Sequence, residues 1–252
     1  MKIIYIKKST IKLILIITII LAFDIVFLKV KSDTLKYSDY DLALVEKYNN
    51  KKLLALTFDD GPSKYTLQIL DILQKENVKA TFFVLGQNII NNEDIVLREY
   101  TDGHLIGIHS YEHVFFTKLK KEDILYQITT TNSMINDITN FSPIYIRVPY
   151  GSTNNRVNSI LKEQNLENIL WNVDSLDWSY KDSDKTTTQV FKNVTGNDII
   201  LMHDTFDSTV KATENIIKHY KENSYEFVTI YEFYRIKKIA KSLNWYYTFL
   251  LI

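Results

Sequence analysis

Short apolar segments alternate with amphipathic segments along most of the chain after residue 50. Seven apolar segments, each of three to six residues, predict strands: 53–58, 81–85, 104–108, 144–146, 169–173, 199–202 and 227–229. Each is followed by a segment with helical spacing: 65–76, 88–100, 121–138, 155–164, 186–194, 208–220 and 230–243. Apolar strands joined by helices are typical of a parallel sheet that is covered on both faces. We therefore predict an α/β fold, a distorted (β/α) barrel of about seven parallel strands, similar to a TIM barrel, with a doubly wound open sheet as the alternative.

The N-terminal segment has a different pattern, in which lysines precede an apolar run over 13–28 that only Thr18 and Asp24 interrupt. Residues 11–30 are just long enough to cross a bilayer core of ~30 Å, and no clear small-x-small cleavage site follows Ala22. We predict that residues 1–31 form a basic cytoplasmic tip and a transmembrane signal anchor. The expected location is the cell membrane, single-pass, with the main domain outside the cytoplasm; cleavage and secretion is the alternative.

The remaining boundaries follow from composition. Residues 32–50 are polar and predict a stalk, 51–243 form the main domain, and 244–252 are an apolar tail. Lys plus Arg and Asp plus Glu both number 30, so the formal net charge is zero, which argues against a nucleic-acid-binding protein. Cysteine is absent, so thiolate chemistry is excluded and any metal must be held by histidine and carboxylate side chains.

Two adjacent carboxylates, Asp59 and Asp60, follow the first predicted strand and precede a Gly61-Pro62 break. Successive strand side chains point to opposite faces, so the two carboxylates diverge. One of them can then face a metal while the other faces a substrate. A solvated turn is the alternative, because Asp-Gly-Pro is ordinary turn chemistry.

A histidine pair, His109 and His113, follows the third predicted strand. On a helical turn, side chains four residues apart share one face. Three ligands of histidine and carboxylate type commonly form a Zn²⁺ site with open positions, and Asp60 is the candidate third ligand. Two surface histidines are the alternative, and we expect His104 in the same strand to be structural.

Three further polar segments follow later strands. Arg147 ends the fourth strand and can orient a carboxylate by a charge-assisted hydrogen bond or form a structural ion pair. The amide of Tyr150, which follows a proline, can point into the same site. Asp174 and Trp178 follow the fifth strand, where an aromatic ring beside carboxylates suits a sugar face or belongs to the core. His203 ends the sixth strand, and a histidine near a carboxylate is a common general acid.

Five of these segments, in this order, resemble the polysaccharide deacetylases, the NodB-homology domain of carbohydrate esterase family four. They are Thr57-Phe58-Asp59-Asp60-Gly61-Pro62, His109-Ser110-Tyr111-Glu112-His113, Arg147-Val148-Pro149-Tyr150, Asp174-Ser175-Leu176-Asp177-Trp178 and Leu201-Met202-His203. The fold of that family, a distorted (β/α) barrel, agrees with the predicted elements. The resemblance does not include the N-terminal segment, the stalk or the tail.

The resemblance also implies roles for ten residues. Asp60, His109 and His113 would hold a divalent metal, most often Zn²⁺, with Co²⁺, Mn²⁺ or Ni²⁺ as alternatives. The other implied roles are the general base (Asp59), its orienting partner (Arg147), the general acid (His203), the carboxylate that tunes this acid (Asp174), an oxyanion-hole amide (Tyr150) and the walls of an apolar acetyl pocket (Leu201 and Trp178).

The implied function is a metal-dependent hydrolase that removes acetyl groups from N-acetylglucosamine-type residues of a polysaccharide. Cell-wall peptidoglycan is the expected substrate if the main domain faces outward. An O-acetyl esterase on xylan-like glycans and a chitin oligosaccharide deacetylase remain alternatives. A non-catalytic glycan-binding pseudoenzyme is disfavoured, because no motif position is missing. The expected partners are the polysaccharide and, through the N-terminal helix, the membrane; we expect a monomer that does not bind nucleic acid.

Overall fold

The computed structural model describes residues 7–34 and 37–250. The chain divides into two compact units, one of residues 50–233 and one that combines residues 1–49 with 234–252. The first unit contains every strand that the structure describes and all of the predicted site residues.

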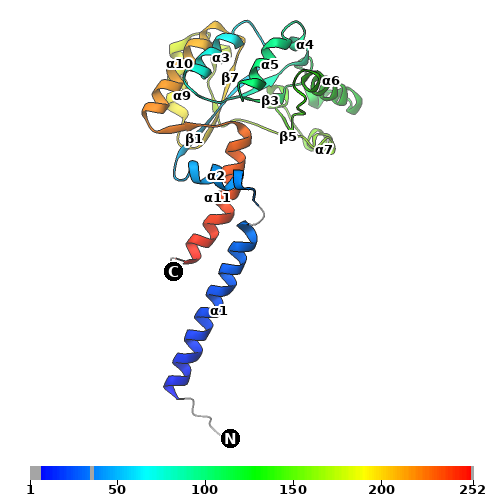
Figure 1. Cartoon of the computed structure of the whole chain (residues 1–252). Coiled ribbons are helices and arrows are strands. Elements are labelled where there is room, and N and C mark those ends of the chain that lie inside the picture. The colour runs from blue at the N-terminus through cyan, green and yellow to red at the C-terminus, as the bar shows by residue number, and fades with distance from the viewer. Residues whose placement is uncertain (1–6, 35–36, 251–252) are drawn as a thin grey trace. The chain divides into compact units, whose positions relative to one another are not determined.

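The larger unit is built on one curled sheet of parallel strands. The strands are β1 (Lys52–Asp59), β2 (Thr81–Val84), β3 (Leu105–Ile108), β4 (Tyr145–Ile146), β5 (Glu167–Asn168), β6 (Val173–Asp174), β7 (Asp198–His203) and β8 (Tyr225–Phe227). Their order is β5-β4-β3-β2-β1-β7-β6, and β8 pairs with the beginning of β1. All pairings are parallel, and helices lie around the outside of the sheet (Figure 1). The predicted α/β barrel is therefore confirmed as an incomplete, curled parallel barrel.

The predicted fifth strand, 169–173, is not formed as one strand: β5 ends at Asn168 and β6 begins at Val173. The amide of Ile169 donates to Ile146 of β4, whereas the amide of Asn172 donates to Ile199 of β7. The chain thus crosses from one edge of the sheet to the other within these residues. Because neither neighbour is kept for long, the run forms no continuous strand, and the two-residue strands β5 and β6 lie at its two ends.

The helices of this unit agree with the predicted amphipathic segments, with two exceptions. They are α3 (Thr66–Lys75), α4 (Gly86–Ile89), α5 (Glu93–Thr101), α6 (Lys121–Thr139), α7 (Asn155–Glu163), α8 (Asp177–Tyr180), α9 (Ser183–Asn193) and α10 (Asp207–Glu222). The predicted helix 88–100 is interrupted where Asn91 adopts a left-handed φ of 65°. Helix α8 was not predicted, since four residues are too few to show a helical period.

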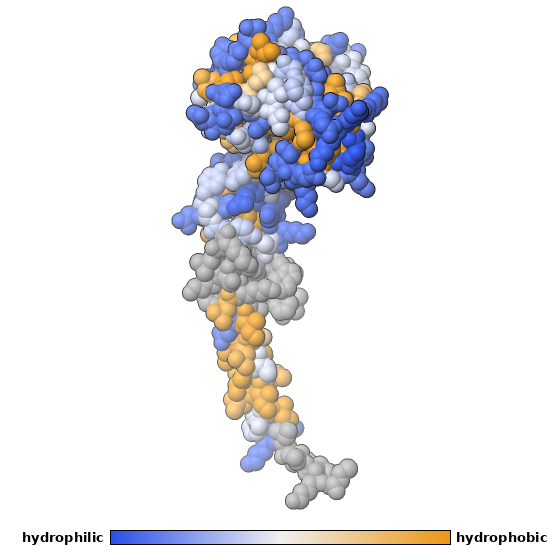
Figure 2. Space-filling view, turned by 90° about the vertical axis from the view of Figure 1, so that its right-hand side faces the viewer, coloured by the Kyte–Doolittle hydropathy of each residue, from blue (hydrophilic) through white to orange (hydrophobic). Residues whose placement is uncertain are grey.

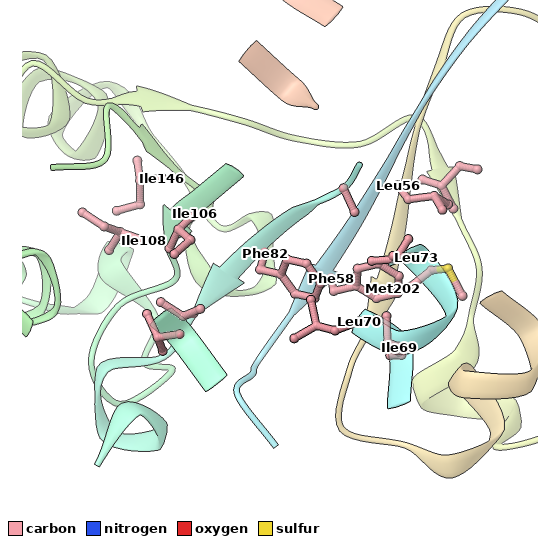
Figure 3. Packing of buried hydrophobic residues seen from close by; sticks show 14 of the residues in the cluster. Leu56, Phe58, Ile69, Leu70, Leu73, Phe82, Ile106, Ile108, Ile146 and Met202 are labelled. Carbon is pink, nitrogen blue, oxygen red and sulfur yellow. The ribbon is translucent and has the colours of Figure 1, made fainter. Parts of the chain in front are cut away.

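The core of this unit fixes the ends of the central strands. Phe58 of β1 and Phe82 of β2 stack with ring centroids 5.2 Å apart. Figure 3 shows these rings beside Leu70 of α3, and all three side chains are almost fully buried. Each fully buried side chain of this size stabilises the fold by about 1.5–3 kcal/mol. The packing therefore holds β1 rigidly up to Asp59, the first carboxylate of the predicted site.

The second unit contains α1 (Lys8–Thr34), α2 (Asp39–Lys47) and most of α11 (Ile230–Leu250). Helix α2 lies in the segment predicted as a stalk and begins with a capping box between Ser38 and Asp41. The guanidinium of Arg235 binds both oxygens of the buried Asp41, at 2.5 and 2.6 Å. This pairing, more than burial, sets the pKa of Asp41, which lies well below its usual range. Helix α11 continues into the predicted tail as far as Leu250.

Helix α1 carries apolar side chains over most of its described length (Figure 2). Within residues 7–34 and 37–250, no helix is both long enough and apolar enough to cross a membrane. The predicted anchor over residues 1–31, of which 1–6 lie outside the described part, is thus not supported.

Candidate active site

A pocket of about 380 Å³ lies at the carboxyl ends of the strands. This is the end at which parallel α/β folds carry their functional residues. Nine of the ten predicted site residues line it: Asp59, Asp60, His109, His113, Tyr150, Asp174, Trp178, Leu201 and His203. The tenth, Arg147, lies behind Asp59 and not on the pocket surface. Val148, Trp171 and Phe206 also line the pocket and were not predicted.

Asp60, His109 and His113 form a cluster with the geometry of a metal site. One ligand atom from each of the three lies within 4.8 Å of the others. Oδ1 of Asp60 is 3.4 Å from Nε2 of His109 and also 3.4 Å from Nε2 of His113. The three side chains come from the ends of β1 and β3, which only the fold brings together.

Hydrogen bonding shows that a cation fits this cluster. Nδ1 of His109 lies 2.6 Å from the carbonyl oxygen of Arg147. A carbonyl only accepts, so Nδ1 carries the proton and Nε2 turns a lone pair toward Asp60. Oδ1 of Asp60 is buried and accepts no well-aligned hydrogen bond from any residue that the structure describes. Acceptors that face one another in this way suit a divalent cation, with the His109 tautomer fixed by its second hydrogen bond.

The pKa values in the cluster favour the protonation states that bind a metal. Burial alone would raise the pKa of Asp60, but the neighbouring imidazoles of His109 and His113 lower it below its ordinary value. Burial lowers the pKa of His113. An ionised carboxylate and a neutral imidazole are the protonation states that bind metals.

The two histidines meet through a loop, and not on the helical turn that their spacing predicted. Ser110 and His113 have left-handed φ values of 80° and 57°, and the His113 amide donates to Oγ of Ser110 at 2.9 Å. The side-chain oxygen of Gln127, on α6, accepts from the amides of residues 111 and 112. This loop brings the two imidazole centroids to 5.0 Å.

Asp59 is held from behind by Arg147. Nη1 of Arg147 donates to Oδ1 of Asp59 and to Oγ1 of Thr57, both at 2.7 Å, and its Nε donates to the carbonyl of Ile169 at 3.0 Å. The guanidinium also lies 4.3 Å from the ring centroid of Phe83. Both charged groups are almost fully buried. The predicted contact between Arg147 and Asp59 is therefore present, and it orients the carboxylate from inside the barrel.

The predicted partner of His203 is wrong. Asp177, and not Asp174, contacts it: Oδ1 of Asp177 lies 2.8 Å from Nδ1 of His203, and Oδ2 accepts the His203 amide at 2.7 Å. Asp174 instead accepts the amide of Leu176 at 2.9 Å. Leu176 has a left-handed φ of 55°, and this turn directs Asp177 toward β7. The five-residue motif contained both carboxylates, but its spacing did not distinguish them.

Asp177 changes the acid–base behaviour of His203. Burial alone would lower the pKa of His203, but the Asp177 hydrogen bond and the nearby carboxylates raise it to about 9. The protonated form is therefore the one that the folded protein stabilises. This stabilisation is complete below the ordinary pKa of 6.5 and is lost as the pH rises through about 9.

We predict that Asp177→Asn lowers the pKa of His203 from about 9 toward or below its ordinary 6.5, because the main anionic partner is removed. NMR titration of the imidazole measures this directly. The matched control is Asp174→Asn, which removes a neighbouring carboxylate that does not touch His203. An equal shift in both variants would contradict the assignment of Asp177.

The pocket has an apolar wall and an aromatic rim. Leu201 is nearly buried in the floor, whereas Trp178 and Tyr150 are 50% and 55% exposed. Tyr150 has a left-handed φ of 63°, and its ring stacks on Phe115 with centroids 3.9 Å apart. Exposed aromatic faces beside a buried polar cluster suit a ligand that has both apolar and polar groups.

The chain is similar to known proteins in both sequence and fold. A family model described as polysaccharide deacetylase matches residues 46–169. The chain is 41% identical over 191 residues to peptidoglycan-N-acetylglucosamine deacetylase PgdA of Listeria monocytogenes, a match that covers 75% of this chain and 40% of that protein. This chain therefore spans about two fifths of the length of the Listeria relative.

Two Bacillus proteins match over more of their length. A peptidoglycan-N-acetylglucosamine deacetylase of Bacillus cereus is 36% identical over 209 residues, which is 78% of this chain and 76% of that protein. Peptidoglycan-N-acetylmuramic acid deacetylase PdaC of Bacillus subtilis is 34% identical. The solved PdaC structure matches with a TM-score of 0.73 over 77% of this chain and 96% of that chain. With this identity and coverage, the chain belongs to the polysaccharide deacetylase family, carbohydrate esterase family four.

Proposed function

We propose that the protein is a metal-dependent hydrolase that removes the acetyl group from N-acetylglucosamine residues of peptidoglycan. The observation that carries the proposal is the composition of one pocket. It combines an Asp-His-His cluster with a carboxylate that is free to act as a base and a histidine that can act as an acid. Asp59 and His203 are register partners on the adjacent strands β1 and β7, so both face the same bound group. Two relatives named for this reaction support the choice of substrate.

Zn²⁺ is the metal we propose for the cluster formed by Asp60, His109 and His113, because two imidazoles and one carboxylate are typical ligands of catalytic zinc. When bound, the ion would polarise the acetamide carbonyl and acidify a water molecule. Asp59 is not one of the proposed ligands: its Oδ1 accepts a hydrogen bond from Nη1 of Arg147, which leaves its Oδ2 to act on the attacking water.

The chain's own residues supply the proton transfers. Asp59 accepts the proton of the water that attacks the acetyl carbonyl. Arg147 binds Oδ1 of Asp59 and so keeps Oδ2 turned toward the pocket. The tetrahedral oxyanion that forms is met by the backbone amide of Tyr150. His203, kept protonated by Asp177, donates its proton to the nitrogen as the carbon–nitrogen bond breaks. Acetate and a free glucosamine amine result.

The apolar wall would select the acyl group. Leu201 and Trp178 line the pocket near the reacting groups, and an acetyl methyl is a small apolar group that fits such a wall. The exposed rings of Trp178 and Tyr150 would contact the sugar face. Phe206 and Trp171 extend this apolar lining.

We predict that chelation of the metal abolishes acetate release and that added Zn²⁺ restores it. His113→Ala should lose Zn²⁺ binding and remain inactive after Zn²⁺ is added, because one of three protein ligands is missing. His219→Ala, on α10 away from the pocket, is the control and should behave as the wild type. Zn²⁺ affinity and acetate release are measured on the same samples. Full activity of the chelated protein would contradict the prediction.

To test which sugar loses its acetyl group, peptidoglycan is treated with the purified protein and then digested. Mass spectrometry of the fragments should find free amines on glucosamine. Free amines on muramic acid would indicate the sugar for which the Bacillus subtilis relative is named. Acetate release from acetylated xylan alone would favour the O-acetyl esterase.

We further propose that the catalytic unit acts outside the cytoplasm, because the proposed substrate lies there. Cell fractionation with an antibody to the protein tests this. Recovery in the membrane or wall fraction, or in the medium, supports the proposal. Recovery in the cytoplasm with the wall unmodified would contradict it.

A further inference from the structure

Asp204, the residue after His203, is fully buried, and its contacts lie in the loop that follows Asp59 and Asp60. Its Oδ2 accepts a hydrogen bond from Oγ1 of Thr66 at 2.5 Å. Its main-chain carbonyl accepts a hydrogen bond from Oγ of Ser63, also at 2.5 Å. One residue directly after β7 thus holds a loop that follows β1 at two positions, Ser63 and Thr66.

The loop is tied internally to the same two side chains. The Ser63 amide donates to Oγ1 of Thr66 at 2.7 Å, and the Tyr65 amide donates to Oγ of Ser63 at 3.0 Å. Oγ1 of Thr66 therefore accepts from the loop backbone and donates its proton to Asp204. This arrangement makes the Thr66 hydroxyl the direct link between Asp204 and the loop backbone.

Gly61 has no side chain, and the Asp204 carboxylate occupies the space that a side chain would take. A Cβ at Gly61 would lie 2.1 Å from Oδ2 of Asp204, so only glycine leaves room for it. On the other side of the loop, the Leu85 amide donates to the Gly61 carbonyl at 2.9 Å, and Nδ2 of Asn88 donates to the Asp60 carbonyl at 2.8 Å. The backbone of residues 60 and 61 is thus held from two sides.

This support matters because of the conformation of Asp60. Its φ of 74° is left-handed, a conformation that is unfavourable for a non-glycine residue and persists only when the surroundings impose it. The direction of its carboxylate toward His109 and His113 depends on that conformation. A loop released from Asp204 would let Asp60 relax toward ordinary φ values and turn its carboxylate away from the imidazoles.

We propose that Asp204 is a positioning residue: through Thr66 and Ser63 it fixes the 61–66 loop and so holds Asp60 in its metal-binding conformation. Because Asp204 also follows His203 directly, the same residue couples the metal-binding carboxylate that follows β1 to the proposed acid at the end of β7. This inference rests on the proposed function for its effect on turnover, and on the geometry alone for its effect on metal affinity.

The test compares Thr66→Val with Thr66→Ser in the full chain. Valine keeps the shape but removes the hydroxyl, whereas serine keeps the hydroxyl. We expect Thr66→Val to weaken Zn²⁺ affinity and to lower kcat, each by about 10–100-fold, as is typical when the residues that orient a metal ligand are removed. Thr66→Ser should stay near the wild type in both. Zn²⁺ affinity is measured by competition with a chromophoric chelator, and the unfolding midpoint of each metal-free variant is recorded.

A second variant, Asp204→Ala, should weaken Zn²⁺ affinity in the same direction as Thr66→Val. Wild-type Zn²⁺ affinity in folded Thr66→Val would overturn the inference, and so would a loss of thermal stability without a loss of affinity. If the wild type released no acetate but Thr66→Val still weakened Zn²⁺ binding, the proposed function would fail while the positioning role of Asp204 would stand.

Discussion

Asp59→Asn is expected to lower kcat by about 10²–10⁴-fold, the usual contribution of a general base, while Zn²⁺ affinity stays at the wild-type value. The amide is isosteric, so its oxygen can still accept from Nη1 of Arg147, but it cannot take a proton from the attacking water. The metal ligands, Asp60, His109 and His113, are unchanged. Acetate release from N-acetylglucosamine oligosaccharides and Zn²⁺ competition on the same preparation measure the two quantities.

The control for this variant is Asp60→Asn, which changes the neighbouring carboxylate. It should lose metal affinity and turnover together, because its Oδ1 is the atom that faces both imidazoles. If Asp59→Asn lost metal affinity to the same extent, or kept near-wild-type turnover, the division of roles between the two carboxylates would be wrong.

Arg147→Met should reduce both stability and turnover. The arginine is fully buried, and its loss leaves the Asp59 carboxylate without its 2.7 Å partner. Removing one member of a buried ion pair typically costs about 3–5 kcal/mol in the free energy of unfolding. Turnover should fall as well, because the hydrogen bond from Arg147 orients Oδ1 of Asp59. Denaturant unfolding followed by circular dichroism gives the first quantity, and acetate release gives the second.

Arg147→Lys is the matched control, since it keeps a positive charge but not the planar fork that reaches Asp59, Thr57 and Ile169 together. Arg147→Lys should retain part of the stability that Arg147→Met loses, and its turnover should fall by a larger factor than its stability would suggest. A free energy of unfolding for Arg147→Met within about 1 kcal/mol of the wild type, the size of a surface ion pair, would show that this pair does not hold the barrel interior.

The sequence predicted those parts of the fold that depend on local patterns. The central strands β1, β2, β3 and β7 are mostly apolar, and most helices have a clear apolar period, so their positions can be predicted from the local sequence. Residues 169–173 could not be predicted correctly from the same signal. These residues form an apolar run that crosses from one edge of the sheet to the other. Which strands they pair with depends on the whole barrel and not on the local sequence.

The site shows the same division. The metal cluster follows from residue types at strand ends, because the carboxyl ends of parallel strands converge. The partner of His203 does not: Asp174 and Asp177 are three residues apart, and a single left-handed residue, Leu176, decides which one faces β7. The hydrogen bonds of Asp204 could not be predicted from the sequence either, because their partners, Thr66 and Ser63, precede it by 138 and 141 positions in the chain.

Acetate release from purified peptidoglycan by the Zn²⁺-loaded protein tests the central proposal most directly. We predict one free glucosamine amine for each acetate released, with release lost on chelation, restored by Zn²⁺ and abolished in Asp59→Asn. If the wild-type protein binds Zn²⁺ but releases no more acetate than Asp59→Asn does, from either peptidoglycan or N-acetylglucosamine oligosaccharides, the protein is not a deacetylase of these glycans.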